Sequence, residues 1–311
     1  MSMILNVVSV LLLVIILMMG VAFLTLLERK MLGYVQSRKG PNKVGHSGAF
    51  QPFSDAVKLF SKEVFYVFQV NVYIYSLCPV FGILMMLMIW MVYPIVTNIY
   101  FMNYSMLFML VILSVGGYVI LMMGWSSNSA YSLLGALRVV AQSVSYEVSF
   151  MFIILVIMML GETYSLGDLW AWQIYIWNLV FIFPVFVLFF ISVLVELNRS
   201  PVDLAEGESE LVSGFNVEYF SGGFALIFMA EYGMIIFFLL FLSILFIGIK
   251  GHILIFFWVS IFSSAIIFMR GILPRMRYDL LMSLCWKIIL PVSLNYLVLV
   301  FVFKVFCMGI F

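Results

Sequence analysis

The chain has 311 residues, of which 66% are hydrophobic and only 9% are Asp, Glu, Lys or Arg. A soluble globular protein carries roughly 25% charged residues, so this chain lacks the polar side chains that would cover a water-exposed surface. The formal net charge of +1 also excludes a general binder of nucleic acids or other polyanions. The composition therefore predicts a polytopic membrane protein.

Long uncharged runs predict eight transmembrane helices. Residues 1–27 carry no charge, and a helix of that length would reach about 40 Å, more than the roughly 30 Å hydrocarbon core. This run lacks a basic n-region and a small-residue cleavage site, so we expect a retained span rather than a signal peptide. Residues 64–137 hold no charged side chain, which is enough for two spans. The expected spans are residues 3–27, 72–97, 104–125, 140–161, 175–196, 221–248, 252–270 and 287–308.

The basic residues support this number of spans. Eight spans leave both termini on one side of the membrane, and the loops at 28–71, 126–139, 197–220 and 270–287 on the other. The fifteen Lys and Arg residues then divide thirteen to two, because only Lys250 and Lys304 lie on the side of the termini. We expect an all-α polytopic fold that forms a single membrane domain over residues 1–311, without internal repeats or a domain linker.

The first basic loop, LERKMLGYVQSRKGPNKVG at 27–45, precedes an amphipathic segment. Pro52 suits a first helical turn. The apolar residues recur at helical spacing opposite Asp55, Lys58 and Lys62, and they are Phe53, Ala56, Val57, Phe60 and Val64. This pattern predicts a helix in the membrane surface. A basic loop on anionic headgroups explains it as well as an entrance for a lipid-soluble substrate does.

Three acidic residues fall inside expected spans. Glu147 lies about two turns into the fourth span, Glu196 at the inner end of the fifth and Glu231 near the middle of the sixth. An ionised carboxylate at this depth costs about 3 kcal/mol, so such groups usually face a polar interior and often transfer protons. Pairing with buried cations is the structural alternative, but the spans hold almost no basic residues.

The loop ELNRSPVDLAEGESELVSGFNVE, residues 196–218, concentrates six carboxylates against the single Arg199. The six are Glu196, Asp203, Glu206, Glu208, Glu210 and Glu218. Ser200, Pro201 and Asp203 resemble a capping box that begins a helix. A solvated acidic loop is the usual explanation for such a run. Glycines and apolar residues among the acids favour instead a loop folded against other protein.

Few ligands are available for a metal or a redox centre. The cysteines Cys78, Cys285 and Cys307 are far apart, and the only histidines are His46 and His252. Zinc and iron–sulfur sites need about four such ligands, and haem needs an axial ligand inside the membrane. Neither a GxGxxG nor a GxxxxGK[ST] motif occurs. We therefore expect no redox cofactor on this chain.

Several segments in order resemble the chain 1 family of mitochondrial NADH:ubiquinone oxidoreductase, the quinone-site membrane subunits of respiratory complex I. They are ERKMLGYVQSRKGPNKVG with QPFSDAVKLFSKE, WSSNSAYSLLGALRVVAQSVSYEVSF, ELNRSPVDLAEGESELVSGFNVEY with FMAEY, and PRMRYD. Val202, where the family commonly has Phe, and Ser200, where it often has Thr, are departures that concern packing rather than chemistry.

The resemblance implies roles for individual residues. The positions that match the ubiquinone tunnel are Glu28, Arg29, Arg38, Asp55, Phe228 and Arg270. Those that match the proton path are Glu147, Glu196, Glu206, Glu218 and Glu231. Those that match the coupling loop are Arg199, Asp203, Glu208 and Glu210.

The resemblance also implies a place and partners. The chain would lie in the mitochondrial inner membrane, with basic loops in the matrix and both termini in the intermembrane space. Ubiquinone would be its substrate, while NADH, FMN and iron–sulfur clusters would bind partner subunits of the peripheral arm. Further partners would be antiporter-like membrane subunits and phospholipids, with no nucleic acid. The isolated chain would not catalyse a reaction.

Three alternatives remain open at this point. The corresponding subunit of a membrane-bound hydrogenase would use similar acids without a quinone. A secondary transporter would explain intramembrane acids, but such proteins usually show inverted repeats and interrupted spans, and we detect neither in the sequence. A structural membrane anchor is the third alternative.

Overall fold

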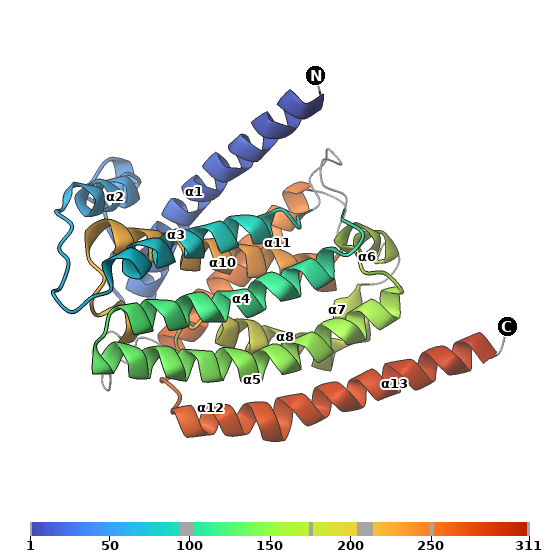
Figure 1. Cartoon of the computed structure of the whole chain (residues 1–311). Coiled ribbons are helices and arrows are strands. Elements are labelled where there is room, and N and C mark those ends of the chain that lie inside the picture. Colours follow the sequence, from blue (N-terminus) through green and yellow to red (C-terminus); the bar gives the residue numbers. More distant parts are fainter. Residues whose placement is uncertain (1, 94–101, 174–176, 204–213, 249–251, 310–311) are drawn as a thin grey trace.

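The computed structural model describes residues 2–93, 102–173, 177–203, 214–248 and 252–309. Within these ranges the regular structure is entirely helical (Figure 1). The first helices are α1 (Ser2–Val35), α2 (Gln51–Ser61), α3 (Val72–Trp90), α4 (Ser105–Ser126), α5 (Ala130–Gly161) and α6 (Leu166–Trp172). The others are α7 (Asn178–Phe181), α8 (Phe183–Glu196), α10 (Ser221–Phe246), α11 (His252–Ile272), α12 (Tyr278–Leu284) and α13 (Leu290–Gly309), with a π-helical turn at Cys285–Ile289 between the last two.

Seven helical segments of the described chain are long and apolar enough to cross a membrane, which confirms an all-α polytopic fold. The eighth expected span, residues 175–196, is interrupted. Its described part consists of the short α7 and the 14-residue α8, and α8 would reach about 21 Å, less than the hydrocarbon core. We detected no interrupted span in the sequence, and the structure shows a break within this one; that residues 175–196 cross the membrane stays a prediction. The break lies at Ile182, two residues before Pro184 in the first turn of α8. Proline has no N–H with which to continue the hydrogen bonds of the preceding turn, so it is tolerated at a helix start but not in a helix interior.

Two loop boundaries differ from those expected. Helix α5 begins at Ala130, so the loop expected at 126–139 shrinks to three residues. Hydroxyl contacts hold this tight turn, since Ser132 Oγ lies 2.5 Å from Ser127 Oγ and 2.7 Å from Ser129 Oγ. Glu147 consequently lies between four and five turns into its helix rather than about two. Helix α1 extends to Val35, so Glu28 belongs to a helix and not to the first loop.

Helix α10 forms the centre of the bundle. It packs against α1, α3 and α11, and its second half is buried on all sides, including Phe237, Phe238 and Phe241 at 1% exposure each. A helix that is apolar around its whole circumference is suited to such a central position. The glutamate and tyrosine in its first half are thereby held between several neighbouring helices.

Figure 1 shows α2 and the turn between α4 and α5 at one end of the bundle, while α1 begins and α13 ends away from that end. Helices α4 and α5 approach very closely near their turn. A methyl group added at Gly124 would lie 2.3 Å from Ala136 Cβ. Small residues allow this approach, as is common where membrane helices cross.

Candidate functional site

Side chains from four separate segments meet at Glu28 of α1. The Glu28 carboxylate is 9% exposed. It accepts hydrogen bonds from Tyr232 Oη of α10 and from Arg270 Nη1 of α11. Arg199, which follows α8, places its Nη1 atom 3.6 Å from Glu28 Oε1. Two arginines and a phenol thus stabilise one buried carboxylate. A charge removed from water needs such partners to offset its lost hydration.

Arg199 connects this cluster, defined here as Glu28, Arg199, Tyr232 and Arg270, to a further acid. Its guanidinium carbon lies 4.4 Å from the centroid of the Tyr232 ring. Burial lowers the pKa of Arg199, but the neighbouring Tyr232 and the acids Glu28 and Glu231 outweigh that effect and raise the pKa, so the side chain stays cationic. Its Nη2 atom is buried without a hydrogen-bond partner in the described chain. A cavity of about 20 Å³ beside the cluster is large enough for one water molecule.

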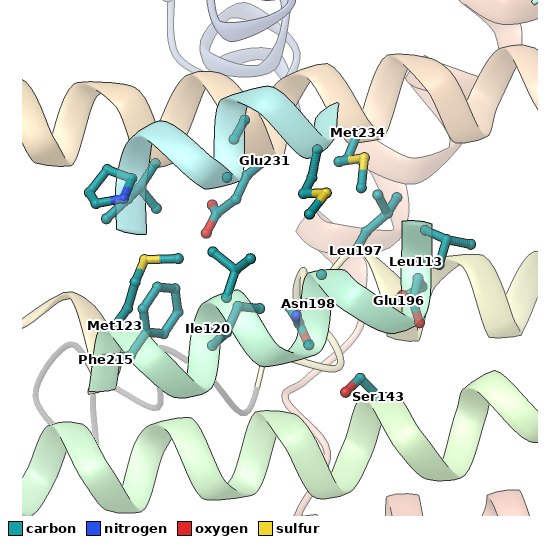
Figure 2. Close-up of a pocket in the computed structure, with 18 of the residues that line it drawn as sticks. Leu113, Ile120, Met123, Ser143, Glu196, Leu197, Asn198, Phe215, Glu231 and Met234 are labelled. Atoms are coloured by element: carbon teal, nitrogen blue, oxygen red, sulfur yellow. The ribbon is translucent and has the colours of Figure 1, made fainter. Parts of the chain in front are cut away.

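A second cavity lies between α10, α4 and the end of α8, and has a volume of about 130 Å³. Glu231 and Glu196 line it together with Ser143 and Asn198, and its remaining wall is largely apolar. Figure 2 shows the Glu231 carboxylate pointing into this space, with Glu196 and Ser143 farther along it. The volume admits several water molecules. Two carboxylates therefore share a small internal space that can be hydrated.

Glu147 continues this row of acids. It lies one helical turn after Ser143 on α5 and is near enough to Glu196 for the two charges to interact. Gln142 Nε2 of α5 donates a hydrogen bond to the Val195 carbonyl, at 2.9 Å, and so fixes the end of α8 against α5. Of the three acids expected inside spans, Glu196 is thus near Glu147 and also lines the cavity that Glu231 lines.

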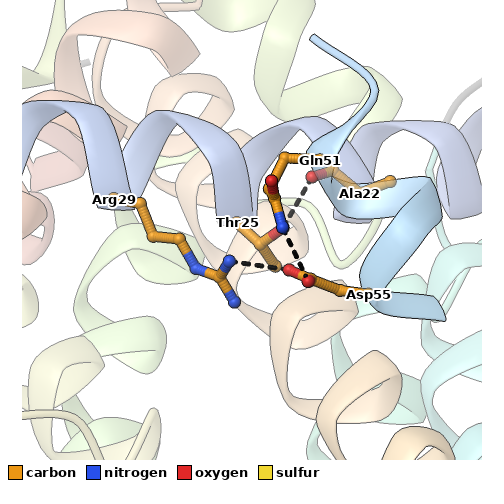
Figure 3. Close-up of polar contacts among 5 residues, drawn as sticks. All are labelled: Ala22, Thr25, Arg29, Gln51 and Asp55. Carbon is orange, nitrogen blue, oxygen red and sulfur yellow. Dashed lines mark hydrogen bonds and ion pairs between the residues drawn. The ribbon is translucent and has the colours of Figure 1, made fainter. Parts of the chain in front are cut away.

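Helix α2 is attached to α1 by a polar contact. Arg29 Nη1 lies 2.6 Å from Asp55 Oδ2, and Gln51 Nε2 donates to Asp55 Oδ1 at 2.9 Å (Figure 3). Asp55 therefore contacts α1, although its side chain stays 35% exposed. The expected apolar stripe is only partly correct, because α2 ends at Ser61, before Val64. Phe60, which does belong to this stripe within α2, has a side chain that is 57% exposed in the described chain.

The remaining residues expected to line a quinone tunnel divide between these contacts. Phe228 lies one turn before Tyr232, with ring centroids 6.2 Å apart, and so contacts one member of the Glu28 cluster. Arg38 lies in an exposed stretch after α1, where its Nε atom donates to Gln36 Oε1 at 2.8 Å. The structure thus brings Arg270 to Glu28 and Phe228 to Tyr232, pairs Arg29 with Asp55, and leaves Arg38 apart.

The acidic loop is described only at its two ends, and Glu206, Glu208 and Glu210 lie outside the described residues. Asp203, 8% exposed, accepts a 2.9 Å hydrogen bond from Arg275 Nη2. The Met276 amide also donates to the Pro201 carbonyl at 2.8 Å. The beginning of the loop is therefore attached to the segment between α11 and α12.

The far end of the loop rests on α3. The backbone carbonyl of Glu218 accepts a hydrogen bond from Tyr75 Oη at 2.5 Å, and the rings of Tyr75 and Tyr219 stack with centroids 4.2 Å apart. Burial raises the pKa of Tyr219 above its ordinary value, so its phenol stays neutral. Glu218 is half-buried and is not among the residues that line the cavity of Glu196 and Glu231.

Two residues of the site were not among those predicted, Tyr232 and Arg275. The segment FMAEY contains Tyr232, but the partner Glu28 is 204 residues away in the chain. Helical spacing places Tyr232 one turn after Phe228, which is the one signal the sequence holds. No group of three or more His, Cys, Asp or Glu side chains that could hold a metal ion occurs among the residues the structure describes.

Comparisons with known proteins agree over nearly the whole chain. A family model described as NADH dehydrogenase matches residues 8–301. The chain is 52% identical over 310 residues to NADH-ubiquinone oxidoreductase chain 1 of Aedes aegypti, which covers 99% of both proteins. It is 49% identical over 292 residues to the protein of that name from Locusta migratoria, covering 94% of this chain and 93% of the relative. The one from Branchiostoma lanceolatum is 45% identical over 300 residues, 96% of each.

Proposed function

The chain belongs to the family of NADH-ubiquinone oxidoreductase chain 1, and from this we propose that it forms part of the ubiquinone tunnel and couples quinone reduction to proton translocation. It acts as a core membrane subunit of complex I in the mitochondrial inner membrane. Peripheral-arm partners carry NADH, FMN and the iron–sulfur clusters, and antiporter-like membrane subunits receive the coupling signal.

One observation carries the proposal: Arg199 Nη1 lies 3.6 Å from Glu28 Oε1, and Glu231 is near enough to help raise the pKa of the same arginine. This arginine lies between Glu28 and the cavity that Glu231 shares with Glu196. Charges interact strongly where water is scarce, so a change of charge at Glu28 alters the field at Glu231 through this arginine. This arrangement is what coupling between a quinone site and a proton path requires.

The entrance of the tunnel is proposed at α2. The Arg29–Asp55 contact holds this helix against α1, while Val57 and Phe60 remain exposed at 67% and 57%. An apolar quinone tail can approach along such a surface from the bilayer. Arg270 at Glu28 and Phe228 at Tyr232 then frame the deeper part of the path.

The proton path is proposed to run through Glu231, Glu196 and Glu147. The cavity of about 130 Å³ between the first two can hold water, which carries protons over distances too long for direct contact. Glu206 and Glu218 remain expected members of the path, and Asp203, Glu208 and Glu210 of the coupling loop. Moving one proton against 150–200 mV costs about 3.5–4.6 kcal/mol, which quinone reduction by the partner subunits must supply.

Substitution of Glu231 tests the proposal. Glu231→Gln keeps the shape of the side chain and removes its ability to carry a proton. We expect quinone-linked turnover and proton pumping to fall about tenfold, which is about 1.4 kcal/mol on the barrier. NADH oxidation by an artificial acceptor should not change, because that reaction bypasses the quinone.

The matched control is Glu63→Gln, which changes an exposed glutamate beyond α2. Blue-native gels measure the amount of assembled complex in both variants. Normal pumping by a fully assembled Glu231→Gln complex would remove Glu231 from the path. Loss of assembly together with both activities would instead identify a purely structural residue.

A further inference from the structure

A large groove separates the ends of α5 and α13, away from the Glu28 cluster. Its volume is about 600 Å³, within the roughly 300–1,000 Å³ of sites that bind small molecules. Leu155, Met158 and Met159 of α5 form one wall, and Phe301 and Val305 of α13 form the other. Phe301 and Val305 are 52% and 57% exposed. The groove is therefore apolar and open towards the surroundings of the helix bundle.

One ion pair lies in this otherwise apolar groove. Lys304 Nζ of α13 contacts Glu162 Oε1, the residue that ends α5. Their side chains keep 25% and 56% exposure respectively. Both residues line the groove, and they therefore set two opposite charges next to a long apolar surface.

The position of the pair corresponds to the membrane interface. Glu162 follows the last turn of a 32-residue apolar helix, and a lysine near the end of a span extends its amine towards the headgroups. Tyr164, which also lines the groove, lies beside Tyr104, with ring centroids 6.1 Å apart. Tyrosines concentrate at this level of membrane proteins because their rings are amphipathic.

We propose that the groove between α5 and α13 binds one zwitterionic phosphoglyceride. The lipid phosphate pairs with Lys304, the ammonium of the headgroup pairs with Glu162, and an acyl chain lies along Met159 and Val305. The site complements both charges of such a headgroup at the depth where a lipid carries them. This binding does not depend on the proposed roles of the acids in proton transfer.

A transmembrane helix of another subunit fits the groove less well. Lys304 and Glu162 pair with each other, but their side chains keep 25% and 56% exposure. The apolar side chains of such a helix would remove water from this exposed part without replacing the lost hydrogen bonds, which is costly for charges. A phosphoglyceride supplies a partner for each charge. Its flexible chain also fills an irregular apolar wall without a matching helix surface.

Photolabelling of the intact complex tests the site. Vesicles contain a phosphatidylethanolamine with a diazirine on one acyl chain, and mass spectrometry locates the labelled peptides. We expect labelling at 155–159 and 301–305. Lys304→Gln should reduce it severalfold, because the variant loses the charge that pairs with the lipid phosphate. Met159→Trp, which fills the groove and keeps the ion pair, should reduce it as well.

Controls separate a site from general contact with lipid. Labelling of the exposed face of α1 around Leu11 and Ile15 should be the same in the wild type and both variants. A diacylglycerol probe, which lacks the charged headgroup, should label the groove as weakly as the ordinary probe labels Lys304→Gln. Equal labelling by the two probes, labelling unaffected by either variant, or crosslinks from the groove to a partner helix would each overturn the proposal.

Discussion

The guanidinium of Arg199 lies over the ring of Tyr232, 4.4 Å from its centroid, while the hydroxyl of the same tyrosine donates a hydrogen bond to Glu28. One aromatic side chain thereby contacts both members of a buried ion pair. A cation over an aromatic face gains more where water is excluded. Tyr232 thus holds Arg199 and Glu28 in a fixed relationship, and it can be changed without altering either charge.

Tyr232→Phe keeps the ring under Arg199 and removes the hydrogen bond to Glu28. A hydrogen bond to a charged group contributes about 1.5–3 kcal/mol, so we expect quinone-linked turnover to fall by about tenfold or more. Tyr118→Phe is the control, since Tyr118 is 69% exposed on α4. Steady-state rates with quinone and with an artificial acceptor compare the two. Equal rates in both variants would show that the hydrogen bond has no role in coupling.

We expect Arg275, but not Arg277, to hold the acidic loop in place. Arg275 pairs with the nearly buried Asp203, whereas Arg277 and Asp279 are 78% and 73% exposed. Arg275→Ala should destabilise the attachment of the loop by about 1–2 kcal/mol, and Arg277→Ala by well under 1 kcal/mol. Limited proteolysis of the purified complex between residues 197 and 220 measures this, with faster cleavage expected only for Arg275→Ala. If the two variants were cleaved at the same rate, the Arg275–Asp203 ion pair would have no role in ordering the loop.

A bulky residue on α2 should affect quinones according to tail length. Ala56 is exposed on this helix, so Ala56→Trp obstructs the proposed entrance without disturbing the Arg29–Asp55 contact. We expect the apparent KM for long-tailed quinones to rise severalfold, while that for short-tailed analogues stays near the wild type. Only a long tail still occupies the entrance while the headgroup reacts. Equal changes for both would indicate general destabilisation of the helix.

The crossing of α4 and α5 should not tolerate a methyl group at Gly124. The added Cβ would lie 2.3 Å from Ala136 Cβ and 2.9 Å from the Ser132 carbonyl oxygen, and such overpacking costs about 1–3 kcal/mol. Gly222→Ala in α10 is the control, because no atom lies within 4 Å of its added Cβ. Thermal inactivation of the two purified complexes should show a lower midpoint for Gly124→Ala alone. Equal midpoints would mean that the helices separate at little cost.

The orientation in the membrane can be tested with thiols. An impermeant thiol reagent applied from the intermembrane-space side should label Ser2→Cys and not Ser37→Cys. The background has its natural Cys78, Cys285 and Cys307 replaced by serine. The expectation follows from the thirteen basic residues that the eight-span arrangement places on the matrix side. The opposite labelling pattern would contradict this orientation of the first span and of the basic loop that follows it.

The sequence by itself determines which segments enter the membrane. Charge-free runs such as 104–125 correspond closely to helices such as α4, Ser105–Ser126, because a charge in hydrocarbon is costly and a span needs about 20 apolar residues. The acids Glu147, Glu196 and Glu231 are conspicuous for the same reason. Hydropathy predicts helix ends less well. Helix α5 begins at Ala130, well before Arg138, because contacts among serines hold the turn that precedes it, and hydropathy does not detect such contacts.

The tertiary structure alone decides which of these residues meet. Glu28, Arg199, Tyr232 and Arg270 come from segments separated by up to 242 residues, and periodicity within one helix contains no information on its partners. Arg199 reads in the sequence as the single cation of an acidic loop, yet it is buried against α1 and α10 between Glu28 and Glu231. Its place follows from the packing of α10 among α1, α3 and α11, because a buried cation is stable only where the assembled helices supply acids around it.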